Sequence, residues 1–130
     1  MRSFSEFYKI AIFSISIISM FAFSSCYKEG NGGKSIVNGY VSHHSHKIPG
    51  ATVYIKYGAV EFPGTDVSKY DASVTADAAA HYEIKDLRKG EYYLYGVGYD
   101  NSIMEIVSGG IGIKLKYNKV TTTDIPVTEH

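Results

Sequence analysis

The chain is poor in several kinds of residue, and each shortage excludes a class of structure or function. Its one cysteine, Cys26, excludes an internal disulfide and a metal site built from several thiolates. Leucine is scarce, whereas helical domains normally rely on leucine and alanine. The formal net charge is zero, which argues against nucleic acid as a partner and against a polybasic patch for anionic lipid.

The abundant residues are those that favour β-structure. The chain has 12 tyrosines and 13 glycines, and valine, isoleucine and threonine are frequent. Strands favour β-branched and aromatic side chains because these pack well on a pleated surface. A length of 130 residues is enough for one domain. Composition therefore predicts a single all-β domain.

The first residues have the pattern of a secretory signal. Arg2 and Lys9 give a positively charged start, and the run 10–23 that follows is apolar or small and carries no charge. A run of this length is too short to span a bilayer comfortably, as is usual for the apolar part of a signal peptide. The run ends just before Cys26, so the chain is expected to be exported.

This junction resembles the lipobox of bacterial lipoproteins, in which small residues precede an invariant cysteine. Ser24 and Ser25 are the small residues here, and Phe23 stands where leucine is usual. The resemblance implies that diacylglycerol alkylates Cys26 and that the signal, residues 1–25, is cut before it. The alternative is an ordinary secretory signal or an uncleaved anchor, in which Cys26 is incidental.

Lipidation would determine where the protein resides, because two or more acyl chains hold a protein durably on a membrane. We therefore expect a membrane-lipid partner through acylated Cys26. The expected location is the bacterial outer membrane, on its periplasmic or cell-surface face. Residues 26–34 are rich in glycine and are predicted to form a flexible tether, which leaves 35–130 as the folded domain.

Short strand-like segments alternate with turn signals throughout that domain, a spacing typical of sandwiches and barrels. The predicted strands are 35–42, 51–60, 71–76, 81–86, 91–97, a sixth strand interrupted at Gly109-Gly110, and 119–127. Each has one apolar face, so two layers are needed to bury these faces. The prediction is a seven-stranded antiparallel two-sheet sandwich.

Four motifs resemble carboxypeptidase regulatory-like domains, a branch of the transthyretin-like (prealbumin-like) sandwiches. They are Gly39-Tyr40-Val41, the step from Ile48 to Val53, the step from Thr75 to Ile84, and the step from Leu87 to Leu94. The resemblance covers about residues 35–127. It implies the sandwich fold and a non-catalytic accessory, adhesive or spacer role.

One residue departs from that family's pattern. Ala80 stands where the family usually has glycine, just before a strand. Glycine at such a position often adopts a positive φ, which costs alanine about 1 kcal/mol. The family pattern therefore predicts backbone strain at Ala80.

Three histidines, His43, His44 and His46, fall in one predicted turn. Histidine is the commonest transition-metal ligand, so the group could chelate zinc or copper. No carboxylate or cysteine stands beside them in the sequence, and no group is evident that would orient their rings. We interpret them as an exposed polar loop and predict no metal and no other cofactor, with metal binding as the alternative.

Three aspartates, Asp66, Asp71 and Asp77, lie along one long connection. Paired carboxylates could hold calcium or act as acid and base, but their spacing matches no calcium loop. No serine sits in a nucleophile-elbow pattern. We therefore interpret the aspartates as solvated loop residues, name no catalytic residue, and predict that the protein is not an enzyme.

Tyrosines give the best functional lead. Tyr54 on one predicted strand, and Tyr93 and Tyr95 on another, alternate away from the predicted core. An exposed aromatic face of this kind stacks on sugar rings or anchors protein partners, whereas cross-strand tyrosine pairs can also merely stabilise a solvated sheet. The predicted function is an accessory or protein-interaction module of the cell envelope. The alternative is a carbohydrate-binding module that uses the tyrosine face.

Overall fold

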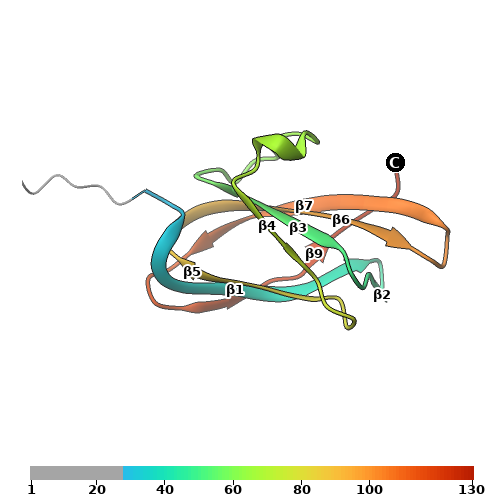
Figure 1. Ribbon diagram of the computed structural model, residues 1–130, viewed down its shortest axis with the longest axis horizontal. Helices are drawn as coiled ribbons and strands as arrows, with labels where there is room; N and C mark the ends of the chain where they lie inside the picture. Colours follow the sequence, from blue (N-terminus) through green and yellow to red (C-terminus); the bar gives the residue numbers. More distant parts are fainter. Residues whose placement is uncertain (1–27) are drawn as a thin grey trace, which may run out of the picture.

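The computed structural model shows two β-sheets stacked face to face (Figure 1). The structure describes residues 28–130, so the predicted signal peptide and Cys26 lie outside the described residues. The strands are β1 (Asn31–His43), β2 (His46–Lys47), β3 (Thr52–Tyr57), β4 (Ala72–Thr75), β5 (His81–Leu87), β6 (Gly90–Asp100), β7 (Glu105–Leu115), β8 (Val120–Thr122) and β9 (Ile125–Pro126), with a 3₁₀ turn η2 (Val67–Lys69). Within residues 28–130, no helix has the length and apolar character needed to cross a bilayer.

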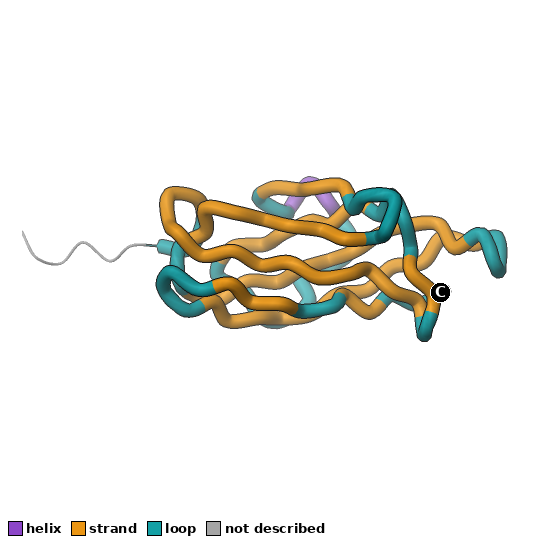
Figure 2. The backbone as a smooth tube through the Cα atoms, turned by 90° about the horizontal axis from the view of Figure 1, so that it is seen from below, coloured by secondary structure: helices purple, strands orange, loops and turns teal. Residues whose placement is uncertain are grey.

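The first sheet is built around β1. Strand β5 pairs with β1 antiparallel, whereas β8 and β9 pair with it in parallel, and β2 continues from it as a short hairpin. The second sheet has the order β4-β3-β6-β7 and is antiparallel throughout. In both layers the strands run along the long axis of the molecule (Figure 2). The predicted all-β, two-sheet sandwich is thus confirmed.

Side chains from both sheets fill one core between the layers. The inward residues alternate along each strand as expected for a half-buried sheet. The largest of the completely buried side chains are Tyr82, Tyr92, Ile48, Ile55, Leu87, Leu94 and Ile125. The two tyrosines keep hydrogen bonds at their hydroxyl groups, to the carbonyl oxygens of Thr123 and Arg88 respectively. Burial of each ring is therefore compatible with a polar tip.

The last part of the chain differs from the prediction. The expected strand 119–127 divides into β8 and β9, which run parallel to β1 instead of antiparallel. The division lies at Thr123 and Asp124, where Asp124 Oδ1 accepts a hydrogen bond from the Tyr40 backbone N–H at 2.9 Å. Gly39 allows the segment around Thr123 to lie close to β1, because glycine has no Cβ. A Cβ at that position would collide with the Thr123 carbonyl.

Two further boundaries also need correction. Strand β7 runs without a break through Gly109-Gly110, because the missing side chains let neighbouring groups lie against the strand. A Cβ on Gly109 would collide with the Pro126 carbonyl. At the other end of the chain, residues 31–34 of the predicted flexible tether belong to β1. The adjacent Gly30 N–H donates a hydrogen bond to the Tyr92 hydroxyl at 2.8 Å.

Ala80 has the strained backbone that the family pattern predicts. Its φ is 65° and its side chain is completely buried. Asp77 holds the turn around it: its carboxylate accepts hydrogen bonds from the backbone N–H groups of Ala79 at 2.8 Å and His81 at 2.9 Å. These bonds lower the pKa of Asp77. Asp77 is therefore a turn residue.

Ala80→Gly is expected to raise the melting temperature, because glycine removes the roughly 1 kcal/mol that a Cβ costs at positive φ. The loss of one buried methyl group offsets part of this gain, so the rise should be at most about 4–8 °C. Ala80→Val is the matched control and should lower the melting temperature, because a β-branched residue fits positive φ poorly. A lower value for Ala80→Gly in thermal unfolding followed by circular dichroism would contradict the assignment.

Candidate functional site

The three predicted tyrosines do lie on the outer face of the second sheet. Tyr54 pairs with Tyr95 across β3 and β6, and Tyr93 pairs with Lys56. However, Tyr93 and Tyr95 are only 8% and 4% exposed. The prediction of an exposed tyrosine face at these two residues is therefore wrong.

The segment between β3 and β4 covers them, and Figure 1 shows it, with η2, above the second sheet. The Phe62 ring lies 5.8 Å from Tyr93 and 5.4 Å from Tyr95, between ring centroids. Tyr70 stacks on Tyr95 at 5.6 Å, and burial raises the pKa of Tyr70 to about 12. Sequence reasoning missed Phe62 and Tyr70 because nothing local indicates that this polar segment folds back over the sheet.

Two of the predicted aspartates hold this covering segment in shape. Asp66 Oδ1 accepts hydrogen bonds from the Ser68 backbone N–H at 3.1 Å and from its hydroxyl at 2.6 Å. The Asp71 carboxylate accepts a bond from the Tyr57 N–H at 2.7 Å. Asp66, Asp71 and Asp77 thus stabilise three separate turns, and the structure does not bring them together.

A hollow of about 260 Å³ opens beside the covered tyrosines, and we call it the aromatic hollow. Its apolar wall consists of the rings of Phe62, Tyr93 and Tyr95. Phe62 is 52% exposed, so its ring is accessible to a ligand. Gly109 and Gly110 also line the hollow.

The other side chains that line the aromatic hollow are polar and, apart from one imidazole, uncharged. They belong to Thr65, Ser108, Thr128 and His130. The Ser108 hydroxyl lies 2.8 Å from His130 Nε2, within hydrogen-bond distance. Aromatic rings facing a few hydroxyl and imidazole groups form a surface that can bind a ligand with one apolar and one polar side.

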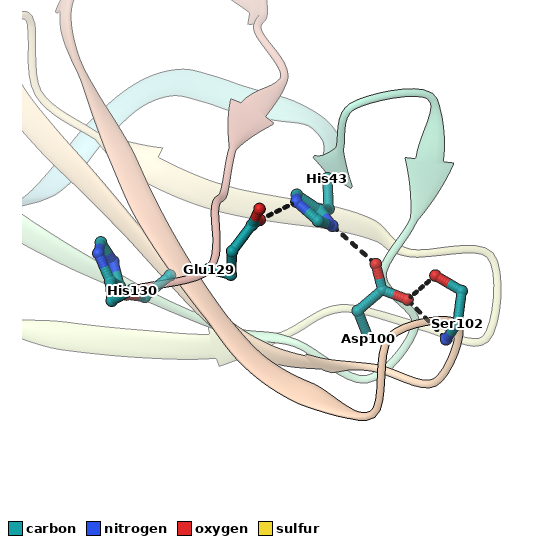
Figure 3. Close-up of polar contacts among 6 residues, drawn as sticks. His43, Asp100, Ser102, Glu129 and His130 are labelled. Carbon is teal, nitrogen blue, oxygen red and sulfur yellow. Dashed lines mark hydrogen bonds and ion pairs between the residues drawn. The ribbon is translucent and has the colours of Figure 1, made fainter.

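A second group of polar residues gathers where the sandwich ends, and we call it the His43 cluster: His43, His44, Asp100, Ser102 and Glu129. Figure 3 shows His43 between Asp100 and Glu129. Its Nδ1 lies 2.8 Å from Asp100 Oδ2, and its Nε2 lies 2.5 Å from Glu129 Oε2. His43 is only 4% exposed, so the prediction that all three histidines are exposed is wrong for this one.

Asp100 remains ionised in the cluster. The Ser102 hydroxyl donates to Asp100 Oδ1 at 2.6 Å, and the Ser102 N–H donates at 2.8 Å. Together with the bond to His43, these lower the pKa of Asp100 to about 2. The hydrogen bond to Asp100, aided by Glu129 and opposed by burial, raises the pKa of His43.

The His43 cluster also contains the residues best placed to hold a metal. Possible ligand atoms of His43, His44 and Glu129 all lie within 4.8 Å of one another, whereas His46 is not part of this group. The expectation that no carboxylate accompanies the histidines is wrong, because the fold brings Asp100 and Glu129 to His43 from distant parts of the chain.

Comparisons with known proteins identify no family. No family model and no curated protein matches the chain. A candidate carbohydrate-binding protein of Pseudomonas aeruginosa is similar in structure, with 14% identity and a TM-score of 0.47 over 75% of this chain and 90% of that one. The major pilin subunit BcpA of Bacillus cereus has 13% identity and a TM-score of 0.48 over 75% of this chain. The minor pilin GBS52 of Streptococcus agalactiae has 13% identity and a TM-score of 0.47 over 80%. The matches span 31% and 46% of the two pilins.

The His43 cluster should make stability depend on pH. Because the folded state raises the pKa of His43 from 6.5, its contribution is complete below pH 6.5 and is lost as the pH rises through the raised value. The pKa of Asp100 is lowered from 3.8 to about 2 in the folded state. The stability that Asp100 contributes is therefore present above pH 3.8 and is lost as the pH falls toward 2. Urea denaturation with EDTA should therefore show a decline in the free energy of unfolding from about pH 6.5 upward.

Asp100→Asn tests whether His43 causes this pH dependence, because the hydrogen bond to Asp100 is the largest effect that raises the pKa of His43. The decline above about pH 6.5 should become shallower in this variant. His46→Gln is the control, because His46 is exposed and lies outside the cluster, and it should keep the wild-type decline. An equal decline in Asp100→Asn and wild type would contradict the assignment.

Proposed function

We propose that the chain is a non-catalytic binding module of the bacterial cell envelope and that it holds a neutral sugar ring in the aromatic hollow. The observation that carries this proposal is that the aromatic residues Phe62, Tyr93 and Tyr95 line the same hollow as the hydroxyl-bearing residues Ser108 and Thr128. One face of a sugar ring presents C–H groups that pack on aromatic rings, and its edge presents hydroxyl groups that need hydrogen-bond partners. The hollow offers both kinds of contact.

Size and charge support a sugar in preference to other ligands. The hollow, at about 260 Å³, is slightly below the range of roughly 300–1,000 Å³ usual for drug-sized ligands, which suits one ring of a longer glycan. None of its lining residues is Asp, Glu, Lys or Arg, so the His130 imidazole is the one lining side chain that can become charged. Glycoside hydrolysis normally needs two flanking carboxylates, which favours binding over cleavage.

The proposal includes the location and family predicted from the sequence. We place the module on the outer membrane through acylated Cys26, facing the periplasm or the outside. The described chain starts at one end of the sandwich, and the β6–β7 hairpin lies at the other end (Figure 1). A lipid-anchored module would thus hold that hairpin away from the membrane. We also propose that the fold is of the carboxypeptidase regulatory-like kind.

A second candidate function is docking of a protein partner at the β6–β7 hairpin. Ile103 and Met104 at its tip are 41% and 75% exposed. Tyr99 and Ile106 form a cross-strand pair beside the tip and are 49% and 67% exposed. Exposed apolar side chains gathered in one place often mark a protein-interaction site.

Phe62→Ala is expected to weaken glycan binding at least about tenfold, a loss of about 1.4 kcal/mol. The physical reason is the removal of the one exposed ring of the aromatic wall. The measurement is a glycan-array screen followed by calorimetric titration of the best binder. Phe62 is preferable to Tyr93 because Tyr93 is buried and its loss would also disturb the fold.

Ile106→Ser is the matched control, since Ile106 is an exposed apolar residue on the same face but outside the hollow. It should keep wild-type glycan affinity. Absence of binding on a broad array, or equal affinity for wild type and Phe62→Ala, would rule out the sugar-binding proposal. Loss of a protein partner in Ile106→Ser alone would support the second candidate.

Lipid attachment is tested separately by labelling cells with a radioactive fatty acid. The wild-type chain should incorporate label and partition with membranes, whereas Cys26→Ser should do neither, because the thiol is the acylated group. Label in Cys26→Ser at the wild-type level would show that Cys26 is incidental.

A further inference from the structure

The His43 cluster contains a buried nitrogen that its protein neighbours do not satisfy. Asp100 is ionised and can only accept, so the His43 Nδ1 that faces it at 2.8 Å is the nitrogen that carries the proton. In the neutral ring, Nε2 then presents a lone pair. This Nε2 is shielded from solvent and makes no hydrogen bond of acceptable geometry with the described residues. Buried polar atoms normally have a partner, so Nε2 needs one.

The nearest group cannot serve as that partner by itself. The Glu129 carboxylate lies 2.5 Å from Nε2, but the two atoms form no hydrogen bond. A carboxylate and an imidazole lone pair are both acceptors, so their close approach requires a positive charge between or beside them. The charge is supplied either by a second proton on His43 or by a cation.

His44 favours the cation. Its ring centroid lies 4.5 Å from that of His43, and its possible ligand nitrogen is within 4.8 Å of those of His43 and Glu129. A second imidazole adds nothing to an imidazolium–carboxylate pair, but it completes a three-ligand set for a metal. We propose that His43, His44 and Glu129 bind a divalent transition-metal cation, foremost Zn²⁺, with water in the fourth position.

The ligand types and their surroundings fit that ion. Zn²⁺ takes imidazole nitrogen and carboxylate oxygen at about 2.0–2.2 Å in tetrahedral geometry. Asp100 would hold the His43 ring through Nδ1, as carboxylates commonly do for metal-ligating histidines. Ser102 in turn holds Asp100, so the buried ligand is positioned in advance. His44 and Glu129 are exposed and can make the small shifts that coordination requires.

Zinc at this position would tie three parts of the chain together. His43 ends β1, His44 lies in the turn before β2, and Glu129 is next to the last residue. The metal would fix the end of the chain against the first sheet, and it should stabilise the fold in proportion to its concentration. This inference concerns a different group of residues from the aromatic hollow and does not depend on sugar binding.

The test is calorimetric titration of the untagged full chain with Zn²⁺, with thermal unfolding in parallel. Wild type is expected to bind one zinc per chain and, at about 100 times Kd, to melt at least about 5 °C higher than in EDTA. Glu129→Gln and His44→Gln should each weaken zinc binding at least about tenfold. Both residues are exposed, so neither change threatens folding as His43→Gln would.

His46→Gln is the matched control, because His46 is an exposed histidine two residues after His44, at the start of β2, and is not one of the proposed ligands. It should bind zinc as tightly as wild type. The absence of zinc binding in wild type overturns the proposal, and so does unchanged affinity in both Glu129→Gln and His44→Gln. In imidazole ¹⁵N spectra, zinc should shift the Nε2 signal of His43 and leave its Nδ1 protonated. A His43 ring that stays doubly protonated in excess zinc would also overturn the proposal.

Discussion

The pairing of β9 with β1 is the contact on which both candidate sites depend. Ile125 lies beside Val41 in parallel register, and this pairing directs the chain across the end of the sandwich. Thr128 then forms a bridge with Ser108 of β7, in the other sheet. The last residues therefore connect the two sheets. Without this pairing, Glu129 would not reach His43, and His130 would not reach Ser108.

Close approach of backbones makes this path possible. A Cβ on Gly39 would collide with Thr123, and one on Gly109 would collide with Pro126. Gly96 on the inner face lies under Ile125 and Val127, where a Cβ would be 3.2–3.3 Å from their methyl groups. In the sequence these glycines resemble strand breakers. In the structure they let residues 123–127 lie close to β1, β6 and β7.

Local chemistry explains what could be predicted from the sequence. Alternation placed Val53, Ile55 and Leu94 in the core because side chains on a strand face opposite sides in turn. The strained turn at Ala80 was predicted from the family resemblance, because glycine is usual at that position in the family. In contrast, β8 and β9 appeared as one antiparallel strand, because nothing within 119–127 indicates that its partner, β1, lies about 80 residues earlier and in parallel.

The candidate sites were less predictable, because their residues also come from distant parts of the chain. Outward alternation of Tyr93 and Tyr95 was correct, but their covering by Phe62 and Tyr70 depends on how a polar loop folds back. The partners of His43 are 57 and 86 residues away in sequence, and no spacing rule connects them. The one local signal was Asp100, whose bonds to Ser102 form a turn typical of aspartate followed two residues later by serine.

The last three residues described contribute to both candidate sites. Thr128 and His130 line the aromatic hollow, whereas Glu129 between them reaches His43 on the other side. This follows from extended backbone, in which successive side chains point in opposite directions. A group that fixes Glu129 must also restrict Thr128 and His130, because they are its covalent neighbours. The polar side of the hollow is therefore only as well ordered as the His43 cluster beside it.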